Sequence, residues 1–384
     1  MDYSVSDEQR AIREEVRRFA ENEIAPVAGE YDEAERYPAD IVREASKIGL
    51  TGAHFPVEYG GVGYSSLENA LVTEELFAVD PGIGLCITSA GFGAEAIISF
   101  GTDDQKERFL PPITDGESVM GAAISEPQAG SDVTSVRTRA ERDGDEWVIN
   151  GSKMWITNGS VGDYFVVMCR TDPDADDRYA GFSQLIVEAD RDGFAADKIT
   201  GKMGIRASDT AELVFDDVRV PAENLVGTEG MGFLQLMQFF DETRTAVAAQ
   251  AVGIAKGACE RALDYARERE QFGRSIGDFQ AIQHKLAEMH TATEAARQLT
   301  YKSAWSVDND EDRLTALASM AKEFASNVAT DVADEAVQIH GGAGFVNDHD
   351  VERLYRDAKI TQIYEGTTEI QKNIIARELL GKGF

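Results

Sequence analysis

The hydrophobic pattern of the chain changes its period twice, and no other feature constrains the fold as strongly. Over about the first 120 residues, apolar side chains recur at helical intervals, as in the capping-box stretch after Ser6 and in Leu67–Phe77. From about Gly121 the pattern becomes strand-like, and from about Gly232 the helical period returns and persists. A chain of 384 residues is also too long for one ordinary core. We therefore predict three domains, spanning residues 1–120, 121–231 and 232–384.

Alternating residues define the predicted strands of the middle region. Glu146–Asn150 and Ser152–Thr157 alternate on either side of Asn150-Gly151, a pair that predicts a tight hairpin. Further strand-like runs lie at Tyr164–Cys169, Ser183–Glu188 and Glu212–Phe215. Together these runs predict a compact antiparallel β domain.

Helical spacing dominates the last region. Apolar residues within 282–296 and 314–332 recur at intervals of three and four. A predicted helix from about Asp241 to Arg269 is rich in Ala and Gly, which allows neighbouring helices to approach closely. This composition favours a buried helical bundle or the core of an oligomer.

The charge balance excludes several classes of partner. The chain has 69 Asp and Glu against 37 Lys and Arg, a formal net charge of −32. Nucleic-acid binding depends on clustered Lys and Arg, and anionic membrane surfaces attract cations, so neither partner is expected. We interpret the excess as a solvated acidic shell, as in salt-adapted proteins of a high-salt cytoplasm. An anionic substrate would then need a local basic pocket.

The cysteines and the N-terminal segment indicate the compartment. Cys86, Cys169 and Cys259 are widely separated, and the sequence has no CxxC motif and no His pair at metal spacing. A disulfide framework and a metal site are therefore not expected. The first residues, MDYSVSDEQR, contain no apolar signal segment, and no run approaches the ~18 apolar residues of a membrane span. We predict a soluble cytoplasmic protein.

Three polar stretches could carry chemistry: Ala123–Asp132 (AISEPQAGSD), Gln338–Phe345 (QIHGGAGF) and Ile363–Ile370 (IYEGTTEI). Each stretch by itself is equally compatible with a turn or a helix cap. The glycines at 60–63 lack the spacing of a dinucleotide fingerprint, and neither a GxSxG motif nor a Walker phosphate loop is present. Each of the five His residues is interpreted as an ordinary, satisfied polar side chain.

Taken together and in order, six motifs resemble the acyl-CoA dehydrogenase family over essentially the whole chain. They are AISEPQAGSDV, KMWITNG, FDDVRVP, ARERxQFGRxIGDFQAIQHKLAEM, QIHGGAGF and RDAKITQIYEGTTEIQKNIIAR. The resemblance implies an α+β multidomain fold with an N-terminal helical domain, a middle antiparallel β domain and a C-terminal four-helix bundle. It also implies bound FAD and a homotetramer.

The resemblance assigns binding roles by position. Segments of the chain's own flavin site match at Ala122, Ala123, Ile124, Ser125, Gly130, Ser131, Trp155, Ile156, Thr157, Thr367, Thr368 and Glu369. The contribution of a neighbouring subunit to FAD matches at Arg269, Phe272, Gln280, Gln338, Gly341 and Gly342. Contacts to the acyl-CoA match at Ser131, Asp241, Arg244, Tyr364 and Gly366.

Glu365 is the catalytic base that the resemblance implies. Desaturation of a thioester needs a carboxylate that takes the α-proton while flavin N5 takes the β-hydride from the other face. The thioester oxygen gains charge, and in the family the flavin ribityl hydroxyl and the backbone N–H of the base residue meet it. Some members carry their base directly before Arg244, where this chain has Thr243. Glu242 lies one residue earlier, about 100° around a helix, and is interpreted as a surface charge.

The predicted function is FAD-dependent oxidation of a saturated acyl-CoA to its trans-2-enoyl-CoA, with electrons passed to electron transfer flavoprotein. An acyl-CoA oxidase and a non-catalytic CoA-ester-binding flavoprotein of the same fold are the alternatives. Thr243 and Glu365 together follow the short- and medium-chain pattern. Branched short chains and glutaryl-CoA stay open, although a glutaryl group would need an additional cation that the sequence does not identify.

Overall fold

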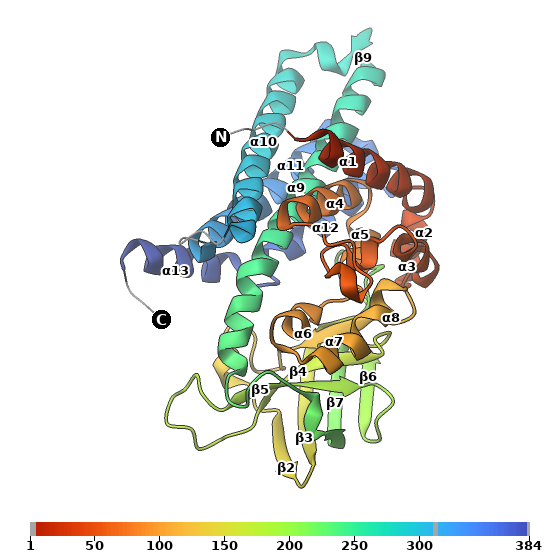
Figure 1. Cartoon of the computed structure of the whole chain (residues 1–384). Helices are drawn as coiled ribbons and strands as arrows, with labels where there is room; N and C mark the ends of the chain where they lie inside the picture. Colours follow the sequence, from red (N-terminus) through yellow and green to blue (C-terminus); the bar gives the residue numbers. More distant parts are fainter. Residues whose placement is uncertain (1–4, 310–313, 382–384) are drawn as a thin grey trace.

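The computed structural model describes residues 5–309 and 314–381. The N-terminal helices pack against the C-terminal helices, and the sheet formed by the middle of the chain lies at one end of this helical body (Figure 1). Capping boxes at Ser6, Ser65 and Thr102 satisfy the first backbone N–H groups of three helices and fix where they begin. The predicted helix at Leu67–Phe77 is therefore present. The N-terminal helices are α1 (Asp7–Phe19), α2 (Ala28–Ala34), α3 (Ala39–Ser46), α4 (Ser66–Val79), α5 (Pro81–Thr88), α6 (Ala94–Phe100), α7 (Asp103–Phe109) and α8 (Pro111–Thr114).

The middle region forms one eight-stranded sheet in the order β6-β7-β3-β2-β4-β5-β8, with β1 paired to β4. Most pairings are antiparallel, as predicted, but β1 and β2 both pair with β4 in parallel. The strands are β1 (Met120–Ala123), β2 (Arg139–Asp143), β3 (Glu146–Thr157), β4 (Tyr164–Arg170), β5 (Phe182–Glu188), β6 (Phe194–Lys198), β7 (Thr210–Pro221) and β8 (Leu225–Val226).

The hairpin predicted at Asn150-Gly151 is wrong. β3 continues through this pair, and its register against β7 shifts between Ile149 and Gly151. The Asn150 side chain explains why the strand continues instead of turning, because it donates to the Asp217 carboxylate and accepts from the Asp217 backbone N–H on β7. The pair therefore forms a bulge, where one strand carries an extra residue. The reversal lies instead between β2 and β3 at Gly144, whose φ of 68° glycine adopts readily.

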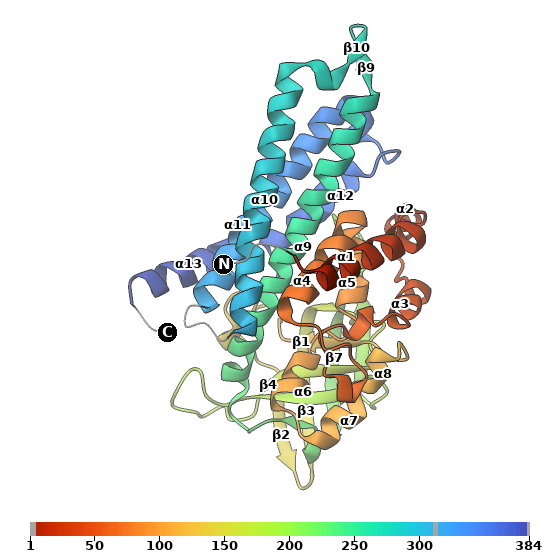
Figure 2. The same cartoon turned by 45° about the horizontal axis from the view of Figure 1, so that its top comes forward.

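Three long helices form the C-terminal bundle, and Figure 2 shows them running side by side. They are α9 (Gly232–Glu268), α10 (Gln280–Asp308) and α11 (Leu314–His340), followed by α12 (Val351–Ala358) and α13 (Thr368–Leu379). Helix α9 begins at the sheet and ends at a small hairpin of β9 (Glu270–Gln271) and β10 (Arg274–Ser275). The α+β arrangement predicted from the sequence is confirmed.

The apolar core connects the two helical regions. One cluster of buried residues extends from Ile12 in α1 to Ala358 in α12 and includes the alanines of α9 and α11. Small side chains permit this approach: a Cβ at Gly253 would come within 2.6 Å of the Glu74 carbonyl oxygen in α4. A second cluster lies within the sheet, and a third joins the sheet to the start of α9 through Phe182 and Phe233. The sheet and the first turns of α9 are thereby held against each other.

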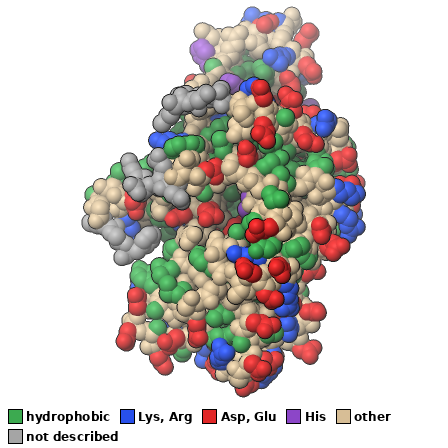
Figure 3. All heavy atoms as spheres, in the orientation of Figure 1, with side chains coloured by type: hydrophobic (Ala, Val, Ile, Leu, Met, Phe, Trp, Pro, Cys, Tyr) green, Lys and Arg blue, Asp and Glu red, His purple; other side chains and the backbone are tan. Residues whose placement is uncertain are grey.

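Acidic side chains cover the molecule broadly. Figure 3 shows Asp and Glu spread over the visible face rather than gathered in one patch. Many of them face Lys or Arg across exposed ion pairs such as Arg219 with Asp143 and Glu146. Exposed pairs of this kind contribute little to stability each, so the shell acts chiefly through net charge.

Candidate active site

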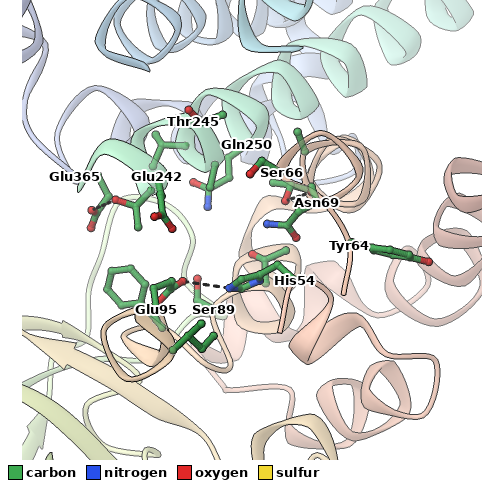
Figure 4. A pocket seen from close by; sticks show the side chains of 18 of the residues that line it. His54, Tyr64, Ser66, Asn69, Ser89, Glu95, Glu242, Thr245, Gln250 and Glu365 are labelled. Carbon is green, nitrogen blue, oxygen red and sulfur yellow. Dashed lines mark hydrogen bonds and ion pairs between the residues drawn. The ribbon is translucent and has the colours of Figure 1, made fainter. Parts of the chain in front are cut away.

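A cavity of about 310 Å³ lies between α4, α5, α6, α9 and the segment that precedes α13. Thr157, at the end of β3, and Glu365 both line it. Thr157 belongs to the predicted flavin segment, and Glu365 is the predicted base. The fold therefore brings together two predicted site segments that are more than half the chain apart in sequence, and Figure 4 shows Glu365 at one end of this cavity.

Glu365 lies on a backbone reversal that other side chains hold in place. Glu365 and Gly366 have φ values of 51° and 87°, so two successive residues adopt the left-handed conformation, which is costly for Glu and easy for Gly. The Gln371 side-chain amide donates to the carbonyls of both residues at 3.0 and 2.9 Å. Lys322 Nζ donates to the Gly366 carbonyl at 2.7 Å. Thr367 then caps α13 by accepting from Ile370 N–H.

The Glu365 carboxylate is surrounded by groups that tune its basicity. Burial raises its pKa above the ordinary value, and the Thr243 hydroxyl, which donates to Glu365 Oε2 at 3.0 Å, limits the rise together with Lys322 and Arg244. Lys322 is fully buried, and this burial lowers its own pKa to about 8. A carboxylate with a raised pKa is a stronger base toward a weakly acidic C–H.

The assignment of Glu242 as a surface charge is wrong. Glu242 is half-buried and lines the same cavity as Glu365. Figure 4 shows the two side chains next to each other at one end of the cavity. Glu242 and Thr243 occupy different angular positions on α9, but the cavity extends far enough around the helix to include both side chains. Burial and the Glu95 carboxylate raise the pKa of Glu242.

The predicted substrate-contacting residues lie in three different places. Asp241 and Arg244 form an ion pair at 2.6 Å on α9, one turn apart, and neither lines the cavity. Arg244 is 5% exposed and close enough to act electrostatically on Glu365. Tyr364 lines the cavity, and its hydroxyl donates to Gln250 Oε1. Gly366 follows the base, whereas Ser131 lies exposed on the loop between β1 and β2.

Two of the predicted flavin segments of the chain, the loop after β1 and the end of β3, lie side by side, whereas Thr367, Thr368 and Glu369 lie at the start of α13. The loop after β1 meets β3, where Met154 N–H donates to the Ser125 carbonyl at 2.9 Å. Lys153 is fully buried, donates to the Ile124 carbonyl and forms an ion pair with Glu126 at 2.9 Å. Together with the Thr138 N–H, which donates to the same carboxylate, Lys153 lowers the pKa of Glu126 to about 2 although burial alone would raise it. The set that comes together comprises Ala122, Ala123, Ile124, Ser125, Trp155, Ile156 and Thr157, with Gly130 and Ser131 on the adjoining loop.

A second set of predicted flavin residues lies at the opposite end of the bundle. Phe272, on the β9–β10 hairpin, is 93% exposed. The end of α11 lies beside the last turns of α9, where the His340 and Tyr265 rings stack with centroids 4.2 Å apart. The part of α9 that follows Gln250 separates these residues from the cavity (Figure 1). They are Arg269, Phe272, Gln280, Gln338, Gly341 and Gly342.

Sequence reasoning missed several residues of the site. Lys322 lies on the inward face of α11, where the only available signal was a Lys within an otherwise buried helical stretch. Lys153 gave a similar signal, since it occupies an inward position of an alternating strand. His54, interpreted as an ordinary polar residue, lines the cavity with Nε2 at 3.6 Å from Glu95 Oε1. Glu95 begins α6, and nothing in its local sequence points to a cavity.

Family models describe all three parts of the chain. The models for the N-terminal, middle and C-terminal domains of acyl-CoA dehydrogenases match residues 6–117, 121–218 and 230–380. The chain belongs to the acyl-CoA dehydrogenase family. It is an enzyme of this family, and its relatives extend over its whole length.

One relative is the short-chain-specific acyl-CoA dehydrogenase of Clostridium acetobutylicum, 44% identical and covering 99% of this chain and 100% of its own. Butyryl-CoA dehydrogenase from Megasphaera elsdenii is similar in structure, with a TM-score of 0.95, 40% identity and coverage of 99% and 100%. A chain in the structure of the electron transferring flavoprotein of Acidaminococcus fermentans has a TM-score of 0.96, 43% identity and the same coverage.

Members of the family are FAD-dependent flavoproteins, and the residues present fit this cofactor. Trp155 has φ of 65° at an irregularity of β3, and its ring is 64% exposed next to the Ser125 loop. An exposed flat apolar ring on a bulged strand suits a planar isoalloxazine. A Cβ at Gly130 would meet nothing within 4 Å, so the adjoining loop leaves room for a ligand.

Within residues 5–309 and 314–381, no group of His, Cys, Asp or Glu is arranged to hold a metal ion. Over the same residues, every helix is too short or too polar to cross a bilayer.

Proposed function

We propose that this acyl-CoA dehydrogenase oxidises a saturated short-chain acyl-CoA to the trans-2-enoyl-CoA, with Glu365 as the base. The observation that carries the proposal is the Glu365 carboxylate, held by Thr243 and facing a cavity that also reaches the flavin segment at Thr157. FAD, when bound, accepts the hydride from Cβ. The names of the clostridial and Megasphaera relatives support a short acyl chain.

Glu365 removes the α-proton. The C–H electrons form the new Cα–Cβ double bond as the hydride leaves Cβ with its own electron pair, so the carboxylate becomes a carboxylic acid and the acyl group loses two hydrogens. Burial raises the pKa of the carboxylate and so brings it closer to the weak acid that it must deprotonate. Thr243, Lys322 and Arg244 limit that rise in pKa and so favour the ionised form of the base.

The backbone at Glu365 also suits the thioester oxygen. Among the described residues, the N–H of Glu365 has no hydrogen-bond acceptor, because the left-handed turn directs it away from the preceding helix. Such a free N–H can stabilise negative charge that develops on the thioester oxygen during α-proton removal. Gln371 and Lys322 fix the two peptides that follow and so preserve this orientation.

Electron transfer flavoprotein is the proposed electron acceptor, and a homotetramer is the proposed assembly. The similarity to a chain in the Acidaminococcus electron transferring flavoprotein structure supports the acceptor. The exposed Phe272 hairpin, remote from its own chain's cavity, supports a role in a neighbouring subunit's flavin site.

An anaerobic titration tests the proposed function. The purified holoenzyme should be yellow, and butyryl-CoA should bleach its flavin absorption more readily than octanoyl-, isobutyryl- or palmitoyl-CoA. CoA without an acyl group is the control and should leave the colour unchanged. Fast reoxidation by oxygen alone would identify an oxidase, and a yellow protein that none of these esters bleaches would contradict the proposal.

A further inference from the structure

The cavity that contains Glu365 has a largely apolar surface, but it also carries polar groups that a saturated hydrocarbon chain does not require. Burying apolar groups against apolar walls stabilises a bound alkyl chain, whereas buried polar groups without partners cost free energy. Most of the lining side chains are nevertheless hydroxyl, amide or charged groups. Its apolar members are Pro56, Ala70, Leu85, Phe92, Ile98, Ala246 and Val247.

The charged groups of the lining are almost all acidic. Besides Glu365, the cavity has the carboxylates of Glu95, Glu242 and Asp308, and among its described lining residues there is no Lys or Arg. His54 is the one lining residue that can become a cation. An acyl group that ends in a carboxylate would meet these charges without a countercharge, which disfavours its binding strongly in a cavity.

The three carboxylates differ in how far the protein already satisfies them. Asp308 accepts from the backbone N–H groups of Ser66 and Leu67 at 2.7 and 3.2 Å, so it caps α4. Glu95 accepts from Gly93 N–H at 3.0 Å through one oxygen and faces His54 with the other. Glu242 has neither a hydrogen bond nor an ion pair among the described residues, although it is half-buried. Its acceptor oxygens therefore face the cavity unused.

Neutral polar groups on the opposite wall are also unused. Asn69 has no hydrogen bond from its side-chain amide among the described residues, and the same is true of the Ser66 and Ser89 hydroxyls. Gln250 accepts from Tyr364 through Oε1, but its amide N–H groups point into the cavity without an acceptor (Figure 4). Groups of this kind recover their lost hydration only if a ligand or water meets them.

We infer that the acyl group that fits this cavity carries a hydrogen-bond donor, either a hydroxyl or an ammonium group, beyond the carbons that react. Glu242 is the principal acceptor of that donor, and Glu95 with His54 the secondary one. The same arrangement selects against carboxylate-terminated groups such as glutaryl. This inference rests on the proposed function, because it takes Glu365 as the point where Cα and Cβ lie.

A set of six-carbon thioesters separates the possibilities. Flavin reduction is measured with hexanoyl-CoA, 6-hydroxyhexanoyl-CoA, 6-aminohexanoyl-CoA and adipyl-CoA on the wild-type holoenzyme. A site that supplies unpaired acceptors should favour a donor-bearing substrate over its plain analogue by about tenfold or more in kcat/KM. Adipyl-CoA should be the poorest of the four. The hydroxyl and ammonium compounds together show whether the donor alone or also its charge is recognised.

Two variants link the preference to the named residues. Glu242→Gln replaces the strongest acceptor with a neutral one, so it should reduce the ratio of 6-aminohexanoyl-CoA to hexanoyl-CoA turnover and raise relative turnover of adipyl-CoA. Glu95→Gln should act in the same direction but less. Asp264→Asn is the matched control, because its side chain lies on the same helix, is 71% exposed and removes one negative charge far from the cavity.

The outcomes separate this inference from the proposed function. If hexanoyl-CoA or adipyl-CoA is the best wild-type substrate, the inference is wrong while acyl-CoA dehydrogenation stands. If both Glu variants keep the wild-type substrate ratio, the assigned acceptors are wrong and the inference fails with them. If no acyl-CoA, butyryl-CoA included, bleaches the flavin, the proposed function itself fails.

Discussion

The molecule contains two groups of carboxylates shielded from bulk solvent, one fully buried in α4 and one half-buried along the cavity, and their surroundings are opposite. Glu74 and Glu75, in α4, are surrounded by cations from α1, α9 and α10. Glu365, Glu242 and Glu95 line the cavity, where cations are few. Burial would raise the pKa in both places, but Lys256 and Arg13 bring the pKa of Glu75 below its ordinary value, whereas that of Glu365 stays raised.

The difference separates a structural use of charge from a chemical one. The Glu74 carboxylate accepts from Arg297 Nε at 3.0 Å and from the Tyr301 hydroxyl at 2.6 Å, and Arg13 lies 3.6 Å away. Each oxygen of Glu74 already accepts a hydrogen bond, and the side chain is fully buried among cations, so a ligand cannot reach it. Among the described residues, Glu365 accepts a side-chain hydrogen bond only from Thr243, through one oxygen, so the other oxygen remains available for a proton.

Removing the base should have the largest effect on activity. Glu365→Gln keeps the size and polarity of the side chain but removes the group that accepts the proton, so flavin reduction by acyl-CoA should slow by about 10²–10⁴-fold. Stopped-flow absorbance of the flavin measures this rate. Glu75→Gln, its counterpart in the paired cluster, should reduce flavin at nearly the wild-type rate. Rapid flavin reduction in the Glu365→Gln enzyme would contradict the assignment of Glu365 as the catalytic base.

Breaking the paired cluster should have the largest effect on stability. Glu74→Ala removes a fully buried carboxylate and leaves the half-buried Arg297 with Glu294 as its acidic partner, so the free energy of unfolding should fall by about 3–5 kcal/mol. Urea denaturation followed by circular dichroism measures the change. Glu242→Ala removes a carboxylate of the cavity that has no protein partner, and its stability should change little. Equal losses in the two variants would show that both clusters are structural.

A smaller effect is expected from the lysine behind the base. Lys322→Met removes the bond to the Gly366 carbonyl and the buried cation near Glu365, so the base loses orientation and its pKa rises further. Because a net hydrogen bond contributes about 1 kcal/mol, the reduction rate at neutral pH should fall several-fold, by roughly tenfold at most. Lys256→Met, in the paired cluster, should lower stability and leave the rate unchanged. The pH profile distinguishes the two, since only Lys322→Met should shift it.

The sequence predicted the order of the three regions because hydrophobic period depends on local structure. The switch from helical to strand periodicity near Gly121 and back near Gly232 is visible without any tertiary information. Asn150-Gly151 failed for the opposite reason. Its local propensity favours a turn, but the pairing of Asn150 with Asp217 on β7 depends on a residue 67 positions away.

The site was predictable only where motifs carry it. The resemblance named Glu365 and the flavin segments, and the structure places Glu365 and Thr157 on one cavity. Glu242 was misplaced because a helical angle says which way a side chain points, but not how far a cavity extends. Lys322 and Glu95 reach the site from α11 and α6, and no pattern along the chain records which helices enclose it.

The smallest effect, from Thr243→Val, tests the comparison most sharply. The substitution preserves shape and removes the hydroxyl that donates to Glu365 Oε2 at 3.0 Å. This bond stabilises the charged carboxylate, so its loss raises the pKa of Glu365 beyond the rise that burial already causes.

The consequence for catalysis has a definite sign. The base works only when ionised, so the rate of flavin reduction increases as pH rises through its pKa, and the valine variant should show the same limb about one pH unit higher. Well above that pKa the two enzymes should differ little, because the carboxylate is then charged in both. Thr243→Ser, which keeps the hydroxyl, should restore the wild-type limb. If the pH dependence of the Thr243→Val enzyme matched that of the wild type, Lys322 and Arg244 alone would set the pKa of Glu365. The base would then resemble Glu74 and Glu75, whose charge is governed by neighbouring cations, more than its single hydrogen bond indicates.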